Sequence, residues 1–336
     1  MKKLTSHLAA ATVFCALPVM AETKLSVADA FPVGHYVAVQ AGDFWMNKVT
    51  ELTEGEVQFD HFTSGQLGKL TELLDATRDG VSSIAYIPMS SYSSRLPLAG
   101  VAELPGLFET SVRGTRAFNK LLEDDGVRAE FAEENVVPLF GAVLPPYQIA
   151  SAKGSIQSDG DFKAIRLRTP GGILELAASQ LGAVAIPMGG PDMYSAFQRG
   201  TVDATLNSYS SLNSYKLLEV INAASTNGSF GSFAFVYAIN KDQFENLAEE
   251  QQKSLLKAGQ LASENFAKWM DANESEIAKA FAAKGVNTYA IEQAQLEKWN
   301  ASMSAVGDDW ASRLDERGLA GSETLAAWKQ ALSETK

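Results

Sequence analysis

The chain has 336 residues and a formal net charge of −12, with 28 Lys and Arg against 40 Asp and Glu. Proteins that bind nucleic acid or anionic lipid gather basic residues, so this balance argues against both as partners and favours a solvated, acidic surface. With 46% hydrophobic residues, the chain is long enough to form two domains.

The N-terminal segment predicts export. A basic start, Met1–Lys3, precedes an apolar run over Leu8–Val19, and Val19-Met20-Ala21 places small residues at the two positions that a signal peptidase inspects. We expect a signal peptide that is cleaved after Ala21 and a periplasmic location. A permanent transmembrane helix needs about 20 apolar residues, so the run predicts no stable membrane insertion.

The single cysteine, Cys15, lies inside this segment. Bulky Phe14 precedes it, which argues against a lipoprotein processing site. After cleavage the chain would keep 315 of its 336 residues, its charge would change from −12 to −14 through the loss of Lys2 and Lys3, and no thiol would remain. We therefore expect no disulfide, no cysteine nucleophile and no thiolate metal site.

Short apolar runs alternate with helical patterns in the first half of the chain, which is typical of an α/β protein. The expected strands are Lys24–Val27, Val57–Phe62, Ser83–Ile87 and Val136–Val143. The expected helices are Val39–Thr53, Leu70–Arg78 and one or two helices over Arg113–Asn135.

A second series begins after Pro145-Pro146. Its expected strands are Ala164–Arg168, Ala183–Ile186, Ala204–Leu206 and Phe233–Ile239, and its expected helices are Ile173–Leu181, Asp192–Arg199 and Ser211–Val220. The segment between 141 and 233 forms one unit, which implies two crossings and two lobes joined by a hinge. We assign residues 22–144 and 234–272 to lobe I, and residues 145–233 and 273–336 to lobe II.

The segment from Glu249 to Lys284 contains no proline and only one glycine, Gly259, and its apolar residues recur at helical spacing. A single helix of this length would extend for about 50 Å, which exceeds one small lobe. We expect it to lie across both lobes. The alternative is two helices with a break near Asn273.

Motifs of the common enzyme classes are absent: there is no G-x-S-x-G, H-E-x-x-H, Walker A or G-x-G-x-x-G pattern. Only His35 and His61 follow the predicted signal peptide, too few for a zinc site or a catalytic triad without partners that the sequence does not indicate. We expect no catalytic residue, no metal and no cofactor.

Arg168 is the strongest candidate for ligand binding. It ends the alternating segment Ile165–Arg168 and precedes Thr169–Gly172. Ligands of α/β proteins bind outside the carboxyl ends of strands, and a guanidinium there can hold a carboxylate by two charge-assisted hydrogen bonds. Spacing alone leaves open a surface arginine beside a turn, and Arg166 shares the same face, so one of the two arginines can be structural.

Several ordered segments carry a resemblance to a known family. They are Phe62–Gly68 (FTSGQLG), Leu104–Phe108 (LPGLF), Phe162–Pro170 (FKAIRLRTP), Leu181–Ala183 (LGA), Ile186–Met188 (IPM) and Asp192–Asp203 (DMYSAFQRGTVD). Over essentially its whole mature length the chain resembles the extracytoplasmic substrate-binding proteins of TRAP transporters, the DctP-type family.

The resemblance implies two α/β lobes of the Venus-flytrap type, a hinge, and a long helix that braces both lobes. It implies capture of a small organic acid and its delivery to integral membrane subunits that are driven by an ion gradient, without nucleotide hydrolysis. We expect a monomer. Arg168 falls on the family's carboxylate-binding arginine and Asn207 on a ligand-contacting asparagine, and Tyr86 and Tyr147 fall in the cleft.

Two departures from the family pattern concern the ligand. Asp203–Asn207 reads DATLN instead of D-G-Q-E-N, and Tyr147 stands where some relatives have a second arginine. Both disfavour a dicarboxylate or a sialic acid. An aromatic cleft, which would favour a monocarboxylate with an apolar or ring-containing body, is predicted from Phe31, Tyr86, Tyr147, Tyr209 and Phe230. Core packing is the alternative for each of these side chains.

Three other functions stay open at this point. A periplasmic enzyme on the same scaffold would use Tyr147 as an acid, although no nucleophile and base are paired in the sequence. The chain would otherwise serve an ATP-driven importer, or present its ligand to a chemoreceptor.

Overall fold

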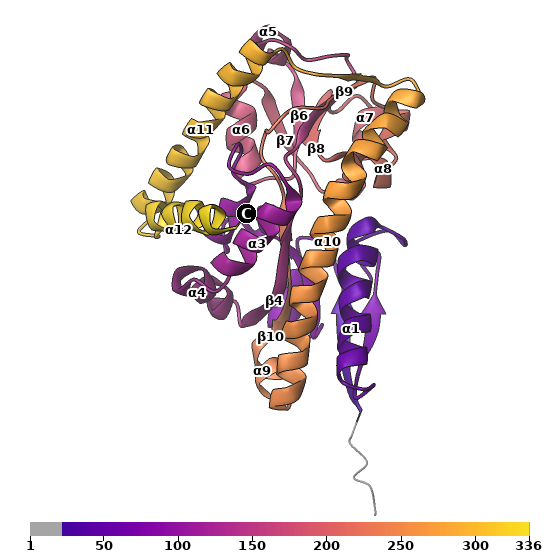
Figure 1. Ribbon diagram of the computed structural model, residues 1–336, viewed down its shortest axis with the longest axis vertical. Coiled ribbons are helices and arrows are strands. Elements are labelled where there is room, and N and C mark those ends of the chain that lie inside the picture. The colour runs from indigo at the N-terminus through magenta and orange to yellow at the C-terminus, as the bar shows by residue number, and fades with distance from the viewer. Residues whose placement is uncertain (1–21, 336) are drawn as a thin grey trace, which may run out of the picture.

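Two β-sheets, placed one beyond the other along the long axis, organise the residues that the computed structural model describes, 22–335 (Figure 1). Helices cover both sheets, and each sheet with its helices forms one lobe. The predicted α/β fold with two lobes is confirmed. The predicted signal peptide, residues 1–21, lies outside the described residues.

Lobe I is built on a five-stranded sheet with the order β2-β1-β3-β10-β4. Its strands are β1 (Thr23–Ala28), β2 (Val57–Phe62), β3 (Ile84–Pro88), β4 (Val136–Val143) and β10 (Ala234–Asn240). β1 runs parallel to β2 and β3, whereas β10 runs antiparallel to β3 and β4. All residues of β3 and β10 are buried, as expected for central strands that are covered on both faces.

Lobe II is built on a six-stranded sheet with the order β11-β9-β5-β8-β6-β7. Its strands are β5 (Gln148–Ser151), β6 (Arg166–Thr169), β7 (Val184–Pro187), β8 (Ala204–Asn207), β9 (Ala223–Ser225) and β11 (Asn287–Tyr289). The sequence did not indicate β5, β9 and β11. They have only three or four residues each, too few to establish an alternating pattern.

The helices include those that the sequence predicts and several short ones that it did not indicate. The helices of lobe I are η1 (Ala38–Asp43, a π-helix), α1 (Phe44–Leu52), α2 (Leu73–Arg78), η2 (Met89–Tyr92), η3 (Ala99–Glu103), α3 (Ser111–Leu121), α4 (Asp125–Glu133) and α9 (Lys241–Glu245). Those that follow the lobe II strands are α5 (Asp159–Phe162), α6 (Ile173–Gln180), η4 (Gly190–Asp192), α7 (Met193–Gln198), α8 (Tyr209–Ser214) and η5 (Leu217–Glu219). The short helices that the sequence did not indicate are η2, η3, α5 and α9. Within residues 22–335, no helix combines the length and the apolar character that a bilayer crossing requires.

The long helix α10 (Glu249–Ala283) is continuous over 35 residues, as the sequence predicts, and the alternative of two helices with a break near Asn273 is wrong. It runs beside both lobes (Figure 1), packing on α1, α3 and β4 in lobe I and on α8 and β11 in lobe II. Gly259 allows the close approach to β4, because a Cβ atom there would lie 2.5 Å from the Leu139 carbonyl oxygen.

Two carboxylates on α10 connect it to the two lobes. Asp271 accepts hydrogen bonds from the backbone N–H groups of Ser111 (2.7 Å) and Val112 (2.9 Å), at the start of α3. Glu274 accepts from the N–H groups of Tyr209 (2.7 Å) and Ser210 (2.8 Å), at the start of α8. Each carboxylate accepts hydrogen bonds from the free N–H groups at a helix N-terminus, where a negative charge is favourable. Asp271 and Glu274, one turn apart on α10, therefore hold the two lobes to this helix.

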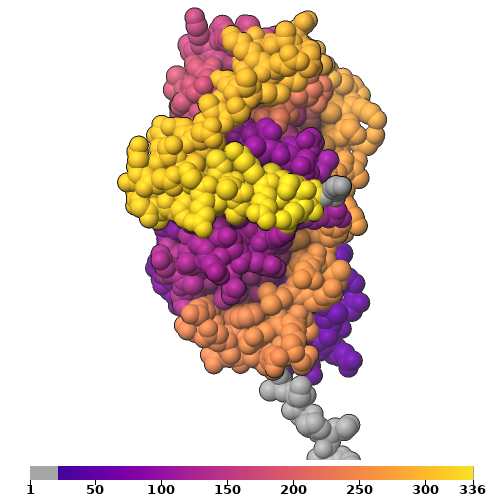
Figure 2. All heavy atoms as spheres, turned by 60° about the vertical axis from the view of Figure 1, so that its left-hand side comes forward, coloured from indigo at the N-terminus to yellow at the C-terminus, as the bar shows by residue number. Residues whose placement is uncertain are grey.

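The last two helices cross from one lobe to the other. α11 (Gln293–Glu316) packs on α6, whereas α12 (Gly321–Glu334) packs on α3 and η3 of lobe I. Figure 2 shows them as a yellow band across the side of the molecule. The assignment of residues 22–144 and 234–272 to lobe I and of residues 145–233 and 273–336 to lobe II stays a prediction. Within the last of these segments, α12 contacts lobe I.

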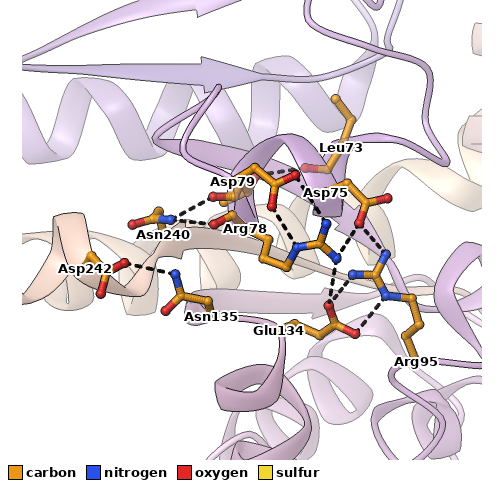
Figure 3. A network of polar contacts seen from close by, with 10 residues as sticks. Leu73, Asp75, Arg78, Asp79, Arg95, Glu134, Asn135, Asn240 and Asp242 are labelled. Carbon is orange, nitrogen blue, oxygen red and sulfur yellow. Dashed lines mark hydrogen bonds and ion pairs between the residues drawn. The ribbon is translucent and has the colours of Figure 1, made fainter.

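A polar network links several side chains of lobe I (Figure 3). Arg95 binds Glu134 through Nε (2.7 Å) and Nη2, and binds Asp75 through Nη1 (2.8 Å). Arg78 binds Asp75 and Asp79, each at 2.8 Å. The network joins α2 to the residue that follows α4, so these arginines have structural partners.

Candidate ligand-binding site

A small cavity lies between the two lobes. Its volume is about 50 Å³, and a water molecule needs about 10–15 Å³ on the same measure. In this closed arrangement it therefore has room for a few waters or one small molecule. Its walls come from both lobes, among them Phe31, His35, Tyr36, Tyr86 and Ser91 from lobe I and Tyr147, Arg168, Met193, Asn207, Ser211 and Tyr215 from lobe II.

Arg168 lies at the carboxyl end of β6, where its strand partners are Ile186 of β7 and Thr205 of β8. Only 4% of the residue is exposed. Its Nε and Nη2 atoms donate to the carbonyl oxygen of Met188 at 3.1 and 2.7 Å. Burial lowers the pKa of Arg168 to about 10, which leaves the guanidinium charged at neutral pH.

Across residues 22–335, no Asp or Glu lies within ion-pair distance of Arg168. One edge of the guanidinium, Nε with Nη2, is used by the Met188 carbonyl, which leaves the end formed by Nη1 and Nη2. That end matches the two oxygens of a carboxylate. A buried cation without an opposite charge is costly, so an anionic ligand would relieve a penalty that the fold itself does not.

Arg166, two residues earlier on the same strand, has a different environment. Its side chain is 42% exposed and binds the carboxylate of Asp203 through Nε (2.9 Å) and Nη2 (2.8 Å). The Arg166 hydrogen bond holds the pKa of Asp203 down to about 2, against a smaller opposing effect of burial. Arg166 thus joins β6 to the residue before β8.

Asn207, at the end of β8, is 2% exposed and lines the cavity. Its Oδ1 accepts from the Ser208 N–H at 3.0 Å, and its Nδ2 donates to the Met193 sulfur at 3.5 Å. Thioether sulfur is a weak acceptor. The amide therefore keeps donor capacity for a ligand oxygen.

Three of the predicted aromatic residues line the cavity: Phe31, Tyr86 and Tyr147. The Phe31 and Tyr86 rings meet edge to face with centroids 4.5 Å apart. Burial raises the pKa values of Tyr86 and Tyr147 well above their usual range, so both hydroxyls keep their protons.

The structure does not bring Tyr209 and Phe230 to this cavity. The Tyr209 hydroxyl donates to the Ser225 carbonyl oxygen at 2.8 Å, and its ring meets Phe281 edge to face. Phe230 is fully buried against Trp299, with ring centroids 5.7 Å apart. Both have the packing role that the sequence left open as the alternative.

Comparison with known proteins identifies the family of the chain. The bacterial extracellular solute-binding proteins, family 7 (DctP), match this chain over residues 29–313. The chain belongs to this family. A solute-binding protein of this family acts outside the cytoplasm and in transport, which agrees with a cleft between two lobes.

Curated relatives of this solute-binding protein span its length at low identity. The C4-dicarboxylate-binding periplasmic protein DctP of Rhodobacter capsulatus is 26% identical over 292 residues, which cover 84% of this chain and 83% of the relative. The sialic acid-binding periplasmic protein SiaP of Vibrio cholerae is 22% identical over 310 residues, which cover 91% and 94%.

Solved structures have the same fold. One is a marine metagenome TRAP solute-binding protein specific for aromatic acid ligands, in complex with metahydroxyphenylacetate (TM-score 0.87, 23% identity, 94% of this chain and 100% of that one). Another is a TRAP solute-binding protein from Rhodoferax ferrireducens with copurified benzoate (TM-score 0.87, 22% identity, 93% and 98%).

Sequence reasoning missed several cavity residues of this solute-binding protein. Tyr36 of lobe I and Ser211 of lobe II share a hydrogen bond of 2.8 Å across the cleft. Tyr215 reaches His35 with ring centroids 5.1 Å apart, beside Gly190, where a Cβ atom would lie 2.5 Å from the Tyr215 ring. These contacts join segments that are distant in the sequence, so no local signal identifies them.

The two histidines that follow residue 21 have separate environments. His61 Nε2 lies 2.7 Å from Asp29 Oδ2, and Nδ1 lies 3.3 Å from Asp43 Oδ1. Burial lowers the pKa of His61, but the two carboxylates outweigh this effect, and the pKa is raised. Among residues 22–335, no three His, Cys, Asp or Glu side chains are grouped to hold a metal ion.

Proposed function

We propose that this solute-binding protein captures a small monocarboxylate with a ring or apolar body between its lobes. It delivers the ligand to the integral membrane subunits of a TRAP transporter. The observation that carries the proposal is Arg168, the only charged side chain in the cavity wall and one without a carboxylate in ion-pair contact within residues 22–335.

One cation in the wall favours a single negative charge on the ligand. A second carboxylate would be buried without an opposite charge, at a cost of several kcal/mol. Phe31, Tyr86 and Tyr147 supply apolar faces and edges for a ring. The ligands of several structural neighbours, metahydroxyphenylacetate, benzoate and mandelate, are acids of this kind.

Closure of the lobes forms the site. In the open form a carboxylate would dock on Arg168, and the approach of lobe I would bring Phe31 and Tyr86 over it. Removal of water then strengthens the ion pair with Arg168. Closure without ligand differs from the open form by only a few kcal/mol, because a ligand shifts this equilibrium only through its differential affinity.

The proposal includes the cellular setting. The protein is exported to the periplasm, loses its signal peptide after Ala21 and acts as a monomer. The closed surface, which differs from the open one, is what the membrane subunits distinguish.

The test is a thermal-shift screen of the mature protein, residues 22–336, against benzoate, 3-hydroxybenzoate, mandelate, succinate and sialic acid, followed by calorimetry of each hit. The unfolding temperature should rise with benzoate, 3-hydroxybenzoate or mandelate as the concentration of the acid exceeds its Kd. A response to succinate alone, or to a neutral sugar, would contradict the proposed ligand class.

The same samples separate binding from catalysis. Mass spectrometry of an acid recovered after incubation should return it unchanged. Conversion of the acid to a product would favour the periplasmic enzyme, with Tyr147 as its acid.

A further inference from the structure

We propose that His35 donates a hydrogen bond from lobe I to a neutral oxygen of the ligand, a hydroxyl or oxo group distinct from the carboxylate on Arg168. The preferred ligand would then be an oxygen-substituted aromatic monocarboxylate. This inference rests on the proposed function and narrows its ligand class.

His35 forms part of the cavity wall from the lobe opposite to Arg168. It is 3% exposed. Its ring stacks on Phe31, with centroids 4.2 Å apart and planes within 7°, and it also contacts Tyr36 and Tyr215. Phe31 and Tyr36, which belong to the same lobe as His35, orient the imidazole before a ligand arrives, and Tyr215 of lobe II adds its contact in the closed form.

The hydrogen bond at Nδ1 determines the tautomer. The backbone N–H of Val37 donates to Nδ1 at 3.3 Å, so Nδ1 is an acceptor and carries no hydrogen. Burial lowers the pKa of His35 to about 3, and the ring is neutral at physiological pH. A neutral imidazole has one N–H group, so the hydrogen is on Nε2 and this atom is a donor.

Nε2 of His35 has no hydrogen-bond partner in the part of the chain that the structure describes. Buried donors are nearly always paired, and an unpaired one at a ligand cavity calls for an explanation. His61 provides the contrast within the same lobe, because both of its ring nitrogens contact carboxylates. The fold therefore supplies partners for one histidine and leaves the donor of the other for the cavity.

The chemistry of the acceptor follows from the surroundings. The cavity wall contains no second cation that would balance another carboxylate. A neutral N–H group in such a setting suits a hydroxyl or oxo oxygen. Because His35 and Arg168 lie on opposite lobes, both contact one ligand only in the closed form, and this bond adds to the affinity of that form alone.

The test uses matched acids that differ by one oxygen. Calorimetry with the wild type and with His35→Phe would give Kd for benzoate and the three hydroxybenzoates. It would also give Kd for phenylacetate and its hydroxylated form, mandelate. Phenylalanine keeps a ring against Phe31 but has no donor. In the wild type, at least one hydroxylated acid should bind about 5–10-fold more tightly than its parent. In His35→Phe that ratio should fall to about one.

Circular dichroism and thermal unfolding would check that His35→Phe is folded. His35→Gln, which restores a donor, should recover part of the preference. If neither variant folds, nitrogen-15 NMR of the wild type still decides, because it should show a hydrogen on Nε2 of His35 and a shift of that resonance with the hydroxylated acid only.

Three results would overturn the inference. The first is a wild type that prefers no hydroxylated acid over its parent, and the second is a His35→Phe variant that loses affinity equally for parent and hydroxylated acids. The third is a hydrogen on Nδ1 of His35. Failure of the proposed function is a different result. In that case the wild type binds none of these acids, or Arg168→Ala binds them as the wild type does.

Discussion

The two ends of β6 carry the same side chain in opposite circumstances. Arg166 begins the strand, is 42% exposed, and shares two hydrogen bonds with Asp203. Arg168 stands near the other end, is 4% exposed, and donates only to a backbone carbonyl oxygen within residues 22–335. Arg166, which is partly exposed to water, therefore has a carboxylate partner, whereas Arg168 is buried without one.

This difference separates structural from functional charge. A bidentate pair such as Arg166 and Asp203 joins two strands and is complete within the protein. A buried guanidinium without a carboxylate adds little to folding, because its desolvation is not offset by an opposite charge. The desolvation cost of the buried Arg168 guanidinium is offset only when a ligand supplies an anion.

The largest expected effect comes from Arg168→Ala. Calorimetry with benzoate or a hydroxybenzoate should show affinity lower by at least about 2 kcal/mol, because a buried charge-assisted pair is lost. The free energy of unfolding should change little in the absence of ligand. Arg166→Ala is the matched control on the same strand, and its affinity should stay near that of the wild type. Unchanged affinity in Arg168→Ala would refute the carboxylate anchor.

The opposite pattern is expected for Asp203→Asn. Asp203 accepts from the backbone N–H, Nε and Nη2 of Arg166, so the variant should lose about 2 kcal/mol of stability in urea unfolding. Ligand affinity of the folded variant should be retained. A variant with wild-type stability but weakened binding would place Asp203 in the site and remove the contrast between the two arginines.

A smaller loss is expected for Glu274→Gln. Its carboxylate accepts two N–H groups at the start of α8, and a neutral amide keeps only part of this capping. The unfolding free energy should fall by about 1 kcal/mol. Asp271→Asn is the matched change for lobe I. If Glu274→Gln and the wild type had equal free energies of unfolding, the hydrogen bonds between the Glu274 carboxylate and the backbone of α8 would contribute little to stability.

The smallest effect concerns pH. The folded pKa of Asp203, about 2, lies below its unfolded value, so its contribution is present above about pH 4 and is lost as the pH falls toward 2. The stability difference between wild type and Asp203→Asn should therefore shrink by roughly half at pH 3. Urea unfolding at pH 7 and pH 3 measures it. A difference that grows on acidification would contradict the sign of the shift.

The sequence predicts the fold well where a pattern is long. Val57–Phe62 and Val136–Val143 are strands with the predicted bounds, and α10 follows from its sustained helical spacing. The strands β5, β9 and β11 of lobe II were missed because pairing with neighbouring strands, not a pattern of their own, makes them strands. The packing of α12 on lobe I also depends on tertiary contacts that no local signal encodes.

The site divides in the same way. Arg168, predicted because it ends a strand and precedes two glycines, and Asn207, predicted from its place in a family motif, both line the cavity. His35 and Tyr215 were not found, since their contact joins opposite lobes. Tyr209 and Phe230 were predicted to line the cleft but pack elsewhere, because composition does not distinguish an aromatic residue of the core from one at a cavity.

The continuity of α10 has a consequence for how tightly a small acid can be held. Because one unbroken helix packs on both lobes, they remain tethered at all times, and the approach of His35 to a ligand on Arg168 is an intramolecular step. The effective concentration of lobe I at the ligand is then high and independent of the amount of protein. A single additional hydrogen bond can decide between similar acids, since little of its free energy is lost to bringing the two halves of the site together.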